Sequence, residues 1–164
     1  MSQAIRPRGG IIIILTFVAA LLLTILPMPE WLVMFRPEWV ALILIYWCMA
    51  LPQRVGIISG LGLGLLLDTL RGAVLGQHAL ALVVIAYLTH RVHQQVRVYP
   101  RWQQALSVMA LLLLYQLLLL WVSGIMGVSN QLSLYWLPTL SSTLLWPWLY
   151  LILRDVRRHF GVRG

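Results

Sequence analysis

Apolar residues in this chain gather in long stretches instead of alternating with polar ones. A helix needs roughly 20 mostly apolar residues to cross the roughly 30 Å hydrocarbon layer of a bilayer, and somewhat shorter spans also occur. Six stretches approach this length: Gly10–Leu26, Trp39–Leu51, Val55–Leu70, Ala73–Thr89, Ala105–Val122 and Leu132–Leu153. The pattern predicts an all-α integral membrane protein, in which residues 1–164 form a single six-helix transmembrane domain.

The second and third stretches are short, and only Pro52, Gln53 and Arg54 join them. A connection of three residues predicts a tight hairpin between two neighbouring helices. These are also the two spans that we expect to be partly re-entrant, if any is. The longest polar stretch, residues 90–104, is expected to be a basic loop on the cytoplasmic side.

Composition supports a lipid environment for these stretches. The chain is 61% hydrophobic and 10% charged, with a mean hydropathy of +0.89. A soluble domain carries about 25% charged residues. One soluble core could not hide this much apolar surface, so the composition excludes a soluble globular protein.

The net charge of +8 comes from arginine alone, since the chain has no lysine. With six spans, one side of the membrane collects most of the arginines: Arg6, Arg8, Arg54, Arg91, Arg97, Arg101, Arg154, Arg157, Arg158 and Arg163. The other side holds Arg36 and Arg71, with Glu30, Glu38 and Asp68. Basic residues concentrate in cytoplasmic loops, so both termini are predicted to be cytoplasmic. Arginines placed between apolar runs indicate contact with anionic lipids and not with nucleic acid.

Glycine recurs at four-residue spacing at Gly60, Gly64, Gly72 and Gly76, and the missing position of this series holds Asp68. Small residues at this spacing let two membrane helices approach closely along one face. We therefore expect one tight helix contact at Gly60 and Gly64. A second is expected at Gly72 and Gly76, after a turn or break.

A carboxylate inside an apolar span is costly, and it indicates a function, a partner or nearby water. Arg71 follows Asp68 by three residues, which is a spacing that allows an ion pair on one helix face. Two interpretations stay open. Asp68 and Arg71 simply close the helix near the periplasmic boundary, or Asp68 is a buried hydrogen-bonding centre or the wall of a cavity.

Two further sites depend on proline. Pro37 suits the first turn of a helix, and Glu38 complements the positive dipole at that helix start. Arg36, on the arginine-poor side, is a candidate for an ion pair or a partner contact. Pro147, inside the last span, lacks a backbone N–H and predicts a kink.

Residues that could carry catalysis or hold a metal are few. His90 and His93 lie three residues apart, but no acid or cysteine near them completes a metal site. The residue types of a catalytic triad are present in Ser59, His78 and Asp68. The sequence around Ser59 is not that of a nucleophile elbow, so it does not support such a triad. We expect no enzymatic activity, no metal and no cofactor.

At these motifs the chain resembles the MreD family of bacterial rod shape-determining membrane proteins. The resemblance rests on "FRPEWVALILIYWCMALPQRVGIISGLGLGLLLDTLRGAVLGQHALA" at 35–81 and on "LWPWLYLILRDVRRHF" at 145–160. The Gly–Asp68 series belongs to the family signature, and its spacing after the Arg-Pro and Pro-Gln-Arg segments is the specific part. Glu38 departs from the family, where Asp or Asn is usual.

The resemblance implies a non-enzymatic subunit of the cell-elongation machinery in the bacterial inner membrane. Such a subunit scaffolds or regulates peptidoglycan synthesis and maintains rod shape together with MreC. The resemblance also implies a larger complex with MreB, a RodA-type glycosyltransferase and a class B penicillin-binding protein. The implied fold is similar to the six-helix substrate-binding subunits of energy-coupling-factor transporters. The alternative is a small-molecule or lipid-binding carrier component with a pocket near Asp68.

Overall fold

The computed structural model describes residues 8–72, 75–127 and 136–161. All of the regular secondary structure in these residues is helical: α1 (Arg8–Ile25), α2 (Glu30–Val33), α3 (Trp39–Ala50), α4 (Ile57–Arg71), α5 (Gln77–Arg97), α6 (Arg101–Ile125) and α7 (Leu137–His159). The predicted all-α class is therefore confirmed for this part of the chain. All of these helices except α2 overlap the apolar stretches, although 73–74 and 132–135 of the predicted spans lie outside the described residues.

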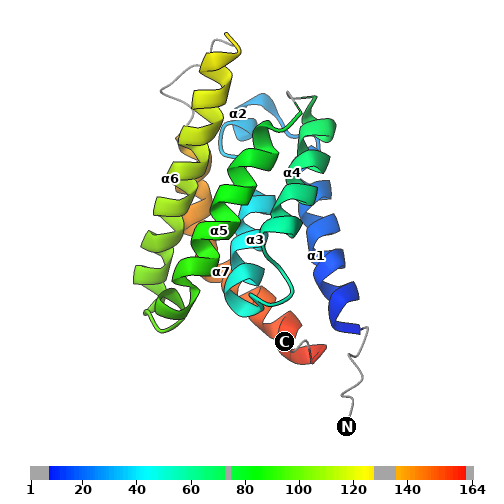
Figure 1. Cartoon of the computed structure of the whole chain (residues 1–164), viewed down its shortest axis with the longest axis vertical. Coiled ribbons are helices and arrows are strands. Elements are labelled where there is room, and N and C mark those ends of the chain that lie inside the picture. Colours follow the sequence, from blue (N-terminus) through cyan, green and yellow to red (C-terminus); the bar gives the residue numbers. More distant parts are fainter. Residues whose placement is uncertain (1–7, 73–74, 128–135, 162–164) are drawn as a thin grey trace.

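The long helices run up and down in the order of the chain (Figure 1). The start of α1, the end of α7, and the α3–α4 and α5–α6 connections lie at one end of the bundle. The short helix α2 and the α4–α5 turn lie at the opposite end. Such an arrangement is the one that six antiparallel spans require, but the crossing of a bilayer by each helix stays a prediction.

Helix α3 occupies the centre of the bundle. Every residue from Val40 to Met49 is buried, and α3 contacts α1, α5, α6 and α7. A helix that is hydrophobic all round belongs in a core. At 12 residues α3 is only about 18 Å long, too short to cross a bilayer unaided. The surrounding helices enclose α3, so its side chains contact protein.

The outer helices expose apolar side chains. Leucine and isoleucine side chains of α1, α4, α6 and α7 face outward, with Ile58 86% and Leu144 75% exposed. Apolar surface of this extent is typical of a face that meets lipid or another protein. Among the described helices, the 25-residue α6 is long and apolar enough to cross a membrane. The segments Gly9–Ile25 and Trp39–Ala50 are apolar but shorter.

The expectation of a loop at residues 90–104 is wrong. Helix α5 continues to Arg97 and α6 begins at Arg101, so the connection is residues 98–100. Glutamine and arginine have good helix propensity, which lets α5 extend beyond its apolar part. The helix ends before Pro100, because a residue that precedes proline is disfavoured in helical conformation.

Helix α7 packs along one face, on which Thr139, Ser142, Trp146 and Leu153 are buried. Trp146 donates from Nε1 to Oε1 of Gln104 on α6, at 3.2 Å. The helix runs through Pro147 without interruption of its assigned range. The kink expected at Pro147 stays a prediction.

The tight contact expected at Gly60 and Gly64 is present between α4 and α5. A Cβ atom added at Gly60 would lie 3.0 Å from the carbonyl oxygen of Leu82. One added at Gly64 would lie 2.2 Å from Cα of Ala79, well inside van der Waals contact. The two backbones therefore pack directly against each other, and backbone atoms cannot move aside as a flexible side chain can.

Substitution of Gly64 by alanine should destabilise the protein by about 1–3 kcal/mol, as overpacking of a core does. Gly62→Ala is the matched control, because a Cβ at Gly62 of the same helix meets nothing within 4 Å. That control should be neutral or up to about 1 kcal/mol more stable, from helix propensity. Thermal unfolding in detergent measures both. Equal stability of the two variants would contradict the direct backbone contact.

Candidate functional site

The α4–α5 turn is built on two glycines in left-handed conformation. Gly72 ends α4 at φ +65°, and Gly76 precedes α5 at φ +100°. Residues with a side chain rarely adopt such angles, whereas glycine does so at little cost. The expectation of a second tight helix contact at these two glycines is wrong, since a Cβ at either would meet nothing within 4 Å. Here glycine is required by the backbone conformation.

The carboxylate of Asp68, on the last turns of α4, caps the start of α5. Its Oδ2 accepts from the backbone N–H of Gly76 at 2.8 Å and of Ala79 at 3.4 Å. Its Oδ1 accepts from the backbone N–H of His78 at 2.8 Å. The first N–H groups of a helix have no partner within the helix, and Gly76 has no side chain to supply one. Asp68 provides that oxygen from the neighbouring helix and is itself fully buried.

The side chain of His78 completes the surroundings of Asp68, with Nδ1 2.6 Å from Oδ1. An ionised carboxylate can only accept, so Nδ1 carries the proton. On the other side of the ring, Nε2 lies 3.4 Å from Nη1 of Arg71. A guanidinium can only donate, so Nε2 accepts and the ring is neutral in this arrangement.

Arg71 pairs with Glu38 and not with Asp68, contrary to the i, i+3 pairing that the sequence allowed. Its Nη2 lies 3.7 Å from Oε2 of Glu38, just before α3. Asp68 is turned toward the start of α5 by four donors, and this leaves Arg71 free to reach across to α3. The pair is partly exposed on the arginine side, at 30% for Arg71.

Glu38 connects this cluster to the last two helices. Its Oε1 accepts from Nε2 of Gln116 on α6 at 3.2 Å, and its backbone N–H donates to Oγ of Ser142 on α7 at 2.9 Å. A chain of polar contacts therefore joins α4, α5, the start of α3, α6 and α7 at one end of the bundle. We call these residues the acid-centred network: Glu38, Asp68, Arg71, His78, Gln116 and Ser142.

Arg36 lies outside that network, and within the described residues it does not form the ion pair for which it was a candidate. It donates to the carbonyl oxygens of Thr24 at 2.6 Å and Leu26 at 2.7 Å. The last carbonyls of a helix have no partner within it, and a basic side chain near that end satisfies them. Arg36 thus stabilises the C-terminal end of α1.

The buried Asp68–His78 pair resembles half of a catalytic triad, but its surroundings do not support nucleophilic catalysis. A general base must reach its nucleophile, and Nε2 of His78 faces Arg71 instead. Ser59 precedes Asp68 by nine residues on α4, which is about 13 Å along the helix axis. In the described ranges, no three His, Cys, Asp or Glu side chains come together to hold a metal.

Sequence reasoning found Asp68, Arg71 and Glu38, named His78 beside Asp68 only as part of a rejected triad, and missed Gln116 and Ser142. The roles of Gln116 and Ser142 depend on contacts 78 and 104 residues apart, which no local spacing reveals. A signal for His78 did exist. It follows the glycine turn at the second residue of α5, where the backbone N–H needs an external acceptor.

Two comparisons with known proteins indicate the same family. A family model described as rod shape-determining protein MreD matches residues 8–156. Rod shape-determining protein MreD of Haemophilus influenzae is 34% identical over 145 residues, which cover 87% of this chain and 88% of the relative. No solved structure matches the chain significantly.

Replacement of Asp68 by asparagine should lower stability by about 1–3 kcal/mol, because an amide NH₂ would then face N–H donors and leave buried groups unpaired. Asp155→Asn is the matched control, since Asp155 is 71% exposed on α7 and pairs only with Arg154 in the described residues. Unfolding by an added denaturing detergent compares the two variants. A D68N protein as stable as D155N would contradict the capping role.

Proposed function

Because this chain belongs to the family of the rod shape-determining protein MreD, a family of membrane proteins that determine rod shape, we propose that it is a non-catalytic scaffold of the elongation machinery. In this proposal it binds the transmembrane helix of MreC and helps to localise or regulate peptidoglycan synthesis. MreB, a RodA-type glycosyltransferase and a class B penicillin-binding protein are further members of the proposed complex.

The observation that carries this proposal is the internal use of Asp68. The carboxylate is fully buried and its four donors all come from the start of α5. A carrier that recognised its cargo through Asp68 would keep an oxygen available to that cargo. The hydrogen bonds of Asp68 instead hold two helices together, which supports a scaffold over a small-molecule or lipid carrier.

The exposed apolar faces support a partner within the bilayer. Membrane helices associate through close packing and not through the burial of apolar surface from water. The outer faces of α1, α4, α6 and α7 offer such surfaces, while α3 is enclosed and unavailable. We propose that one of these outer faces receives the helix of MreC.

We propose a multi-pass topology in the inner membrane, with six spans in one domain and both termini in the cytoplasm. The common position of the α1 start and the α7 end in Figure 1 supports it. The arginine count supports the orientation, since basic residues remain in the cytoplasm. The proposal includes anionic lipids at that end, and a helix arrangement like that of energy-coupling-factor substrate-binding subunits.

Photo-crosslinking in cells that also contain MreC tests the scaffold. A photoreactive amino acid is placed at Ile14, Ile58, Leu117 or Leu144, which are exposed positions of α1, α4, α6 and α7. One face should crosslink to the transmembrane segment of MreC at least several-fold more than the others. Gln94, a polar exposed position of α5, is the control and should give background yield. No crosslink to MreC from any face, or equal yields from all, would refute the proposal.

A further inference from the structure

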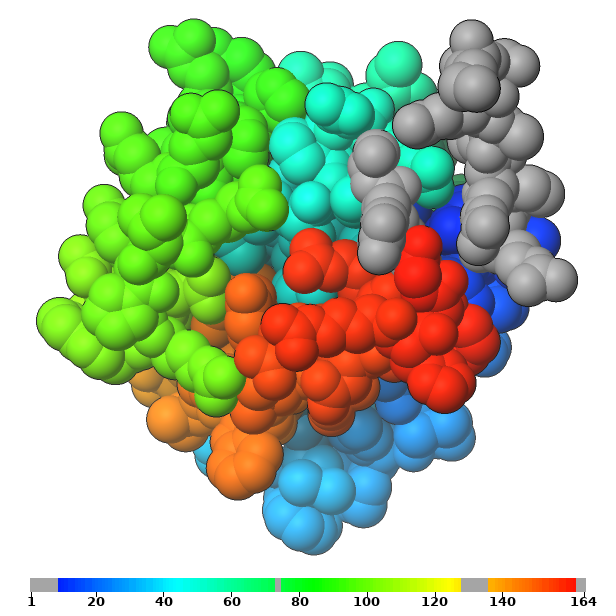
Figure 2. All heavy atoms as spheres, turned by 90° about the horizontal axis from the view of Figure 1, so that it is seen from below, coloured from blue at the N-terminus to red at the C-terminus, as the bar shows by residue number. Residues whose placement is uncertain are grey.

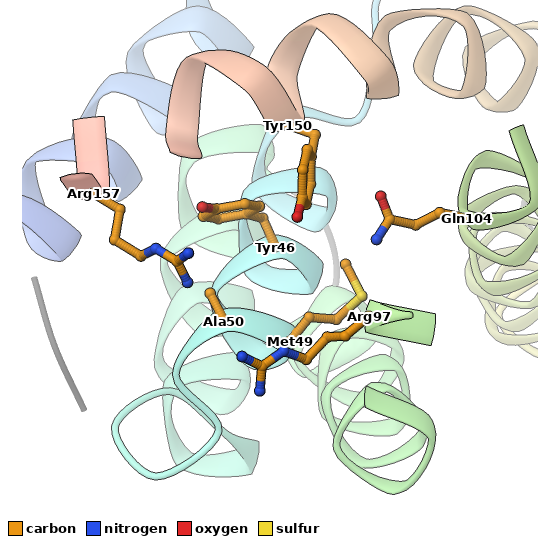
Figure 3. Close-up of a pocket in the computed structure, with 7 residues that line it drawn as sticks. All are labelled: Tyr46, Met49, Ala50, Arg97, Gln104, Tyr150 and Arg157. Atoms are coloured by element: carbon orange, nitrogen blue, oxygen red, sulfur yellow. The ribbon is translucent and has the colours of Figure 1, made fainter. Parts of the chain in front are cut away.

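A polar cavity lies at the end of the bundle opposite the acid-centred network. It has a volume of about 210 Å³. Figure 3 shows its lining, to which α3 contributes Tyr46, α5 Arg97, α6 Gln104, and α7 Tyr150 and Arg157. Figure 2 shows the same end from below, where the end of α7 crosses the face beside the α5–α6 turn.

Two guanidinium groups border this cavity without a counterion. The acids of the chain are Glu30, Glu38, Asp68 and Asp155, and none of them lines the cavity. In the described part of the chain, neither Arg97 nor Arg157 forms an ion pair, and Asp155 is paired with Arg154. Two like charges beside one cavity repel each other, and a bound anion removes that repulsion.

The polar neutral side chains of the lining can donate hydrogen bonds, whereas Met49 and Ala50 are apolar. Tyr46 is 2% exposed, and its hydroxyl has no hydrogen-bond partner in the described residues. A buried hydroxyl normally has one, so this group requires an explanation. The ring of Tyr150 packs edge-on against the ring of Tyr46, with 5.5 Å between the two ring centroids, and helps to hold Tyr46 in place. The amide of Gln104 is fixed by Val96 and Trp146 and keeps one N–H for a further acceptor.

We propose that this cavity binds a phosphate group. Guanidinium groups bind phosphate through paired, charge-assisted hydrogen bonds. The oxygens of a phosphate group can accept hydrogen bonds from both arginines and from the Tyr46 hydroxyl at the same time. A basic side chain in the last turn of a helix is common. The cavity between two such arginines, together with the unpaired hydroxyl, is what indicates a ligand.

The phosphate can come from a phospholipid headgroup or from a small soluble compound. Both arginines lie in the last turns of their helices, α5 and α7, at the arginine-rich end of the bundle. In the proposed topology this end lies at the cytoplasmic headgroup layer, where anionic lipids concentrate. The proposed phosphate site does not depend on binding of MreC. An experiment can therefore refute the phosphate site without refuting the scaffold proposal, and the scaffold proposal without refuting the phosphate site.

Ligand-induced shifts in thermal unfolding test the site on the full-length protein in dodecyl maltoside, a detergent without phosphate. Short-chain phosphatidylglycerol and inorganic phosphate are titrated separately, with a carboxylate amphiphile and chloride as matched anions. We expect saturable stabilisation by phosphatidylglycerol. A response to it alone assigns the site to a lipid headgroup, and a response to both assigns it to any phosphate. No saturable response, or an equal one to the carboxylate amphiphile, would overturn the proposal.

Substitutions in the lining test whether the ligand binds in this cavity. Arg97→Gln and Arg157→Gln should each weaken binding at least about tenfold, as loss of a charge-assisted contact does. Arg158→Gln removes the same charge from the neighbouring exposed position and should change binding less than about twofold. Without ligand, the Tyr46→Phe variant should have an unfolding temperature equal to that of the wild type or higher. It should nevertheless bind the phosphate compound more weakly than the wild type does. Equal weakening by R158Q and R157Q would show charge attraction alone and refute the site.

Discussion

The hydrogen bonds between Asp68 and the start of α5 are the interaction on which the rest of this structure depends. Helix α5 begins at a glycine turn that supplies no capping side chain, and its first N–H groups lie in an apolar bundle. Such groups are costly when unpaired and without water. Asp68 satisfies them from α4, and so ties the end of α4 to the start of α5. Further along the same two helices, Gly60 and Gly64 of α4 pack directly against the backbone of α5.

The capping of α5 also directs the neighbouring charges. With Asp68 occupied, Arg71 reaches Glu38, and Glu38 holds α6 and α7 through Gln116 and Ser142. Buried charges are stable only when they are paired and hydrogen-bonded, and Asp68 and Glu38 are both so satisfied. The network therefore gives the short central helix α3 a defined position, which apolar packing of its uniform surface would not specify. A rigid core of this kind suits a protein whose outer faces receive partners.

The two ends of the bundle use charge in opposite ways. At one end Glu38 and Asp68 are buried, and their hydrogen bonds are made within the protein. At the other end Arg97 and Arg157 border a cavity whose lining contains no acid, and Asp155 of α7 pairs with Arg154. The first arrangement stabilises the fold, whereas the second leaves cations for an external anion. In a membrane protein this asymmetry also agrees with orientation by basic residues.

By itself, the sequence determined the features that depend on neighbouring residues. Long apolar runs set the helices and the membrane class, the spacing of Gly60 and Gly64 predicted a close contact, and the motifs around Asp68 indicated the family. Only the tertiary structure decided the partners of the charges and the role of Gly72 and Gly76. In the structure Asp68 contacts His78, Arg71 contacts Glu38, and most of the loop expected at 90–104 is helix. The physical reason is range: helix formation follows from residues a few positions apart, whereas a buried charge pairs with whatever donor the packed helices bring to it.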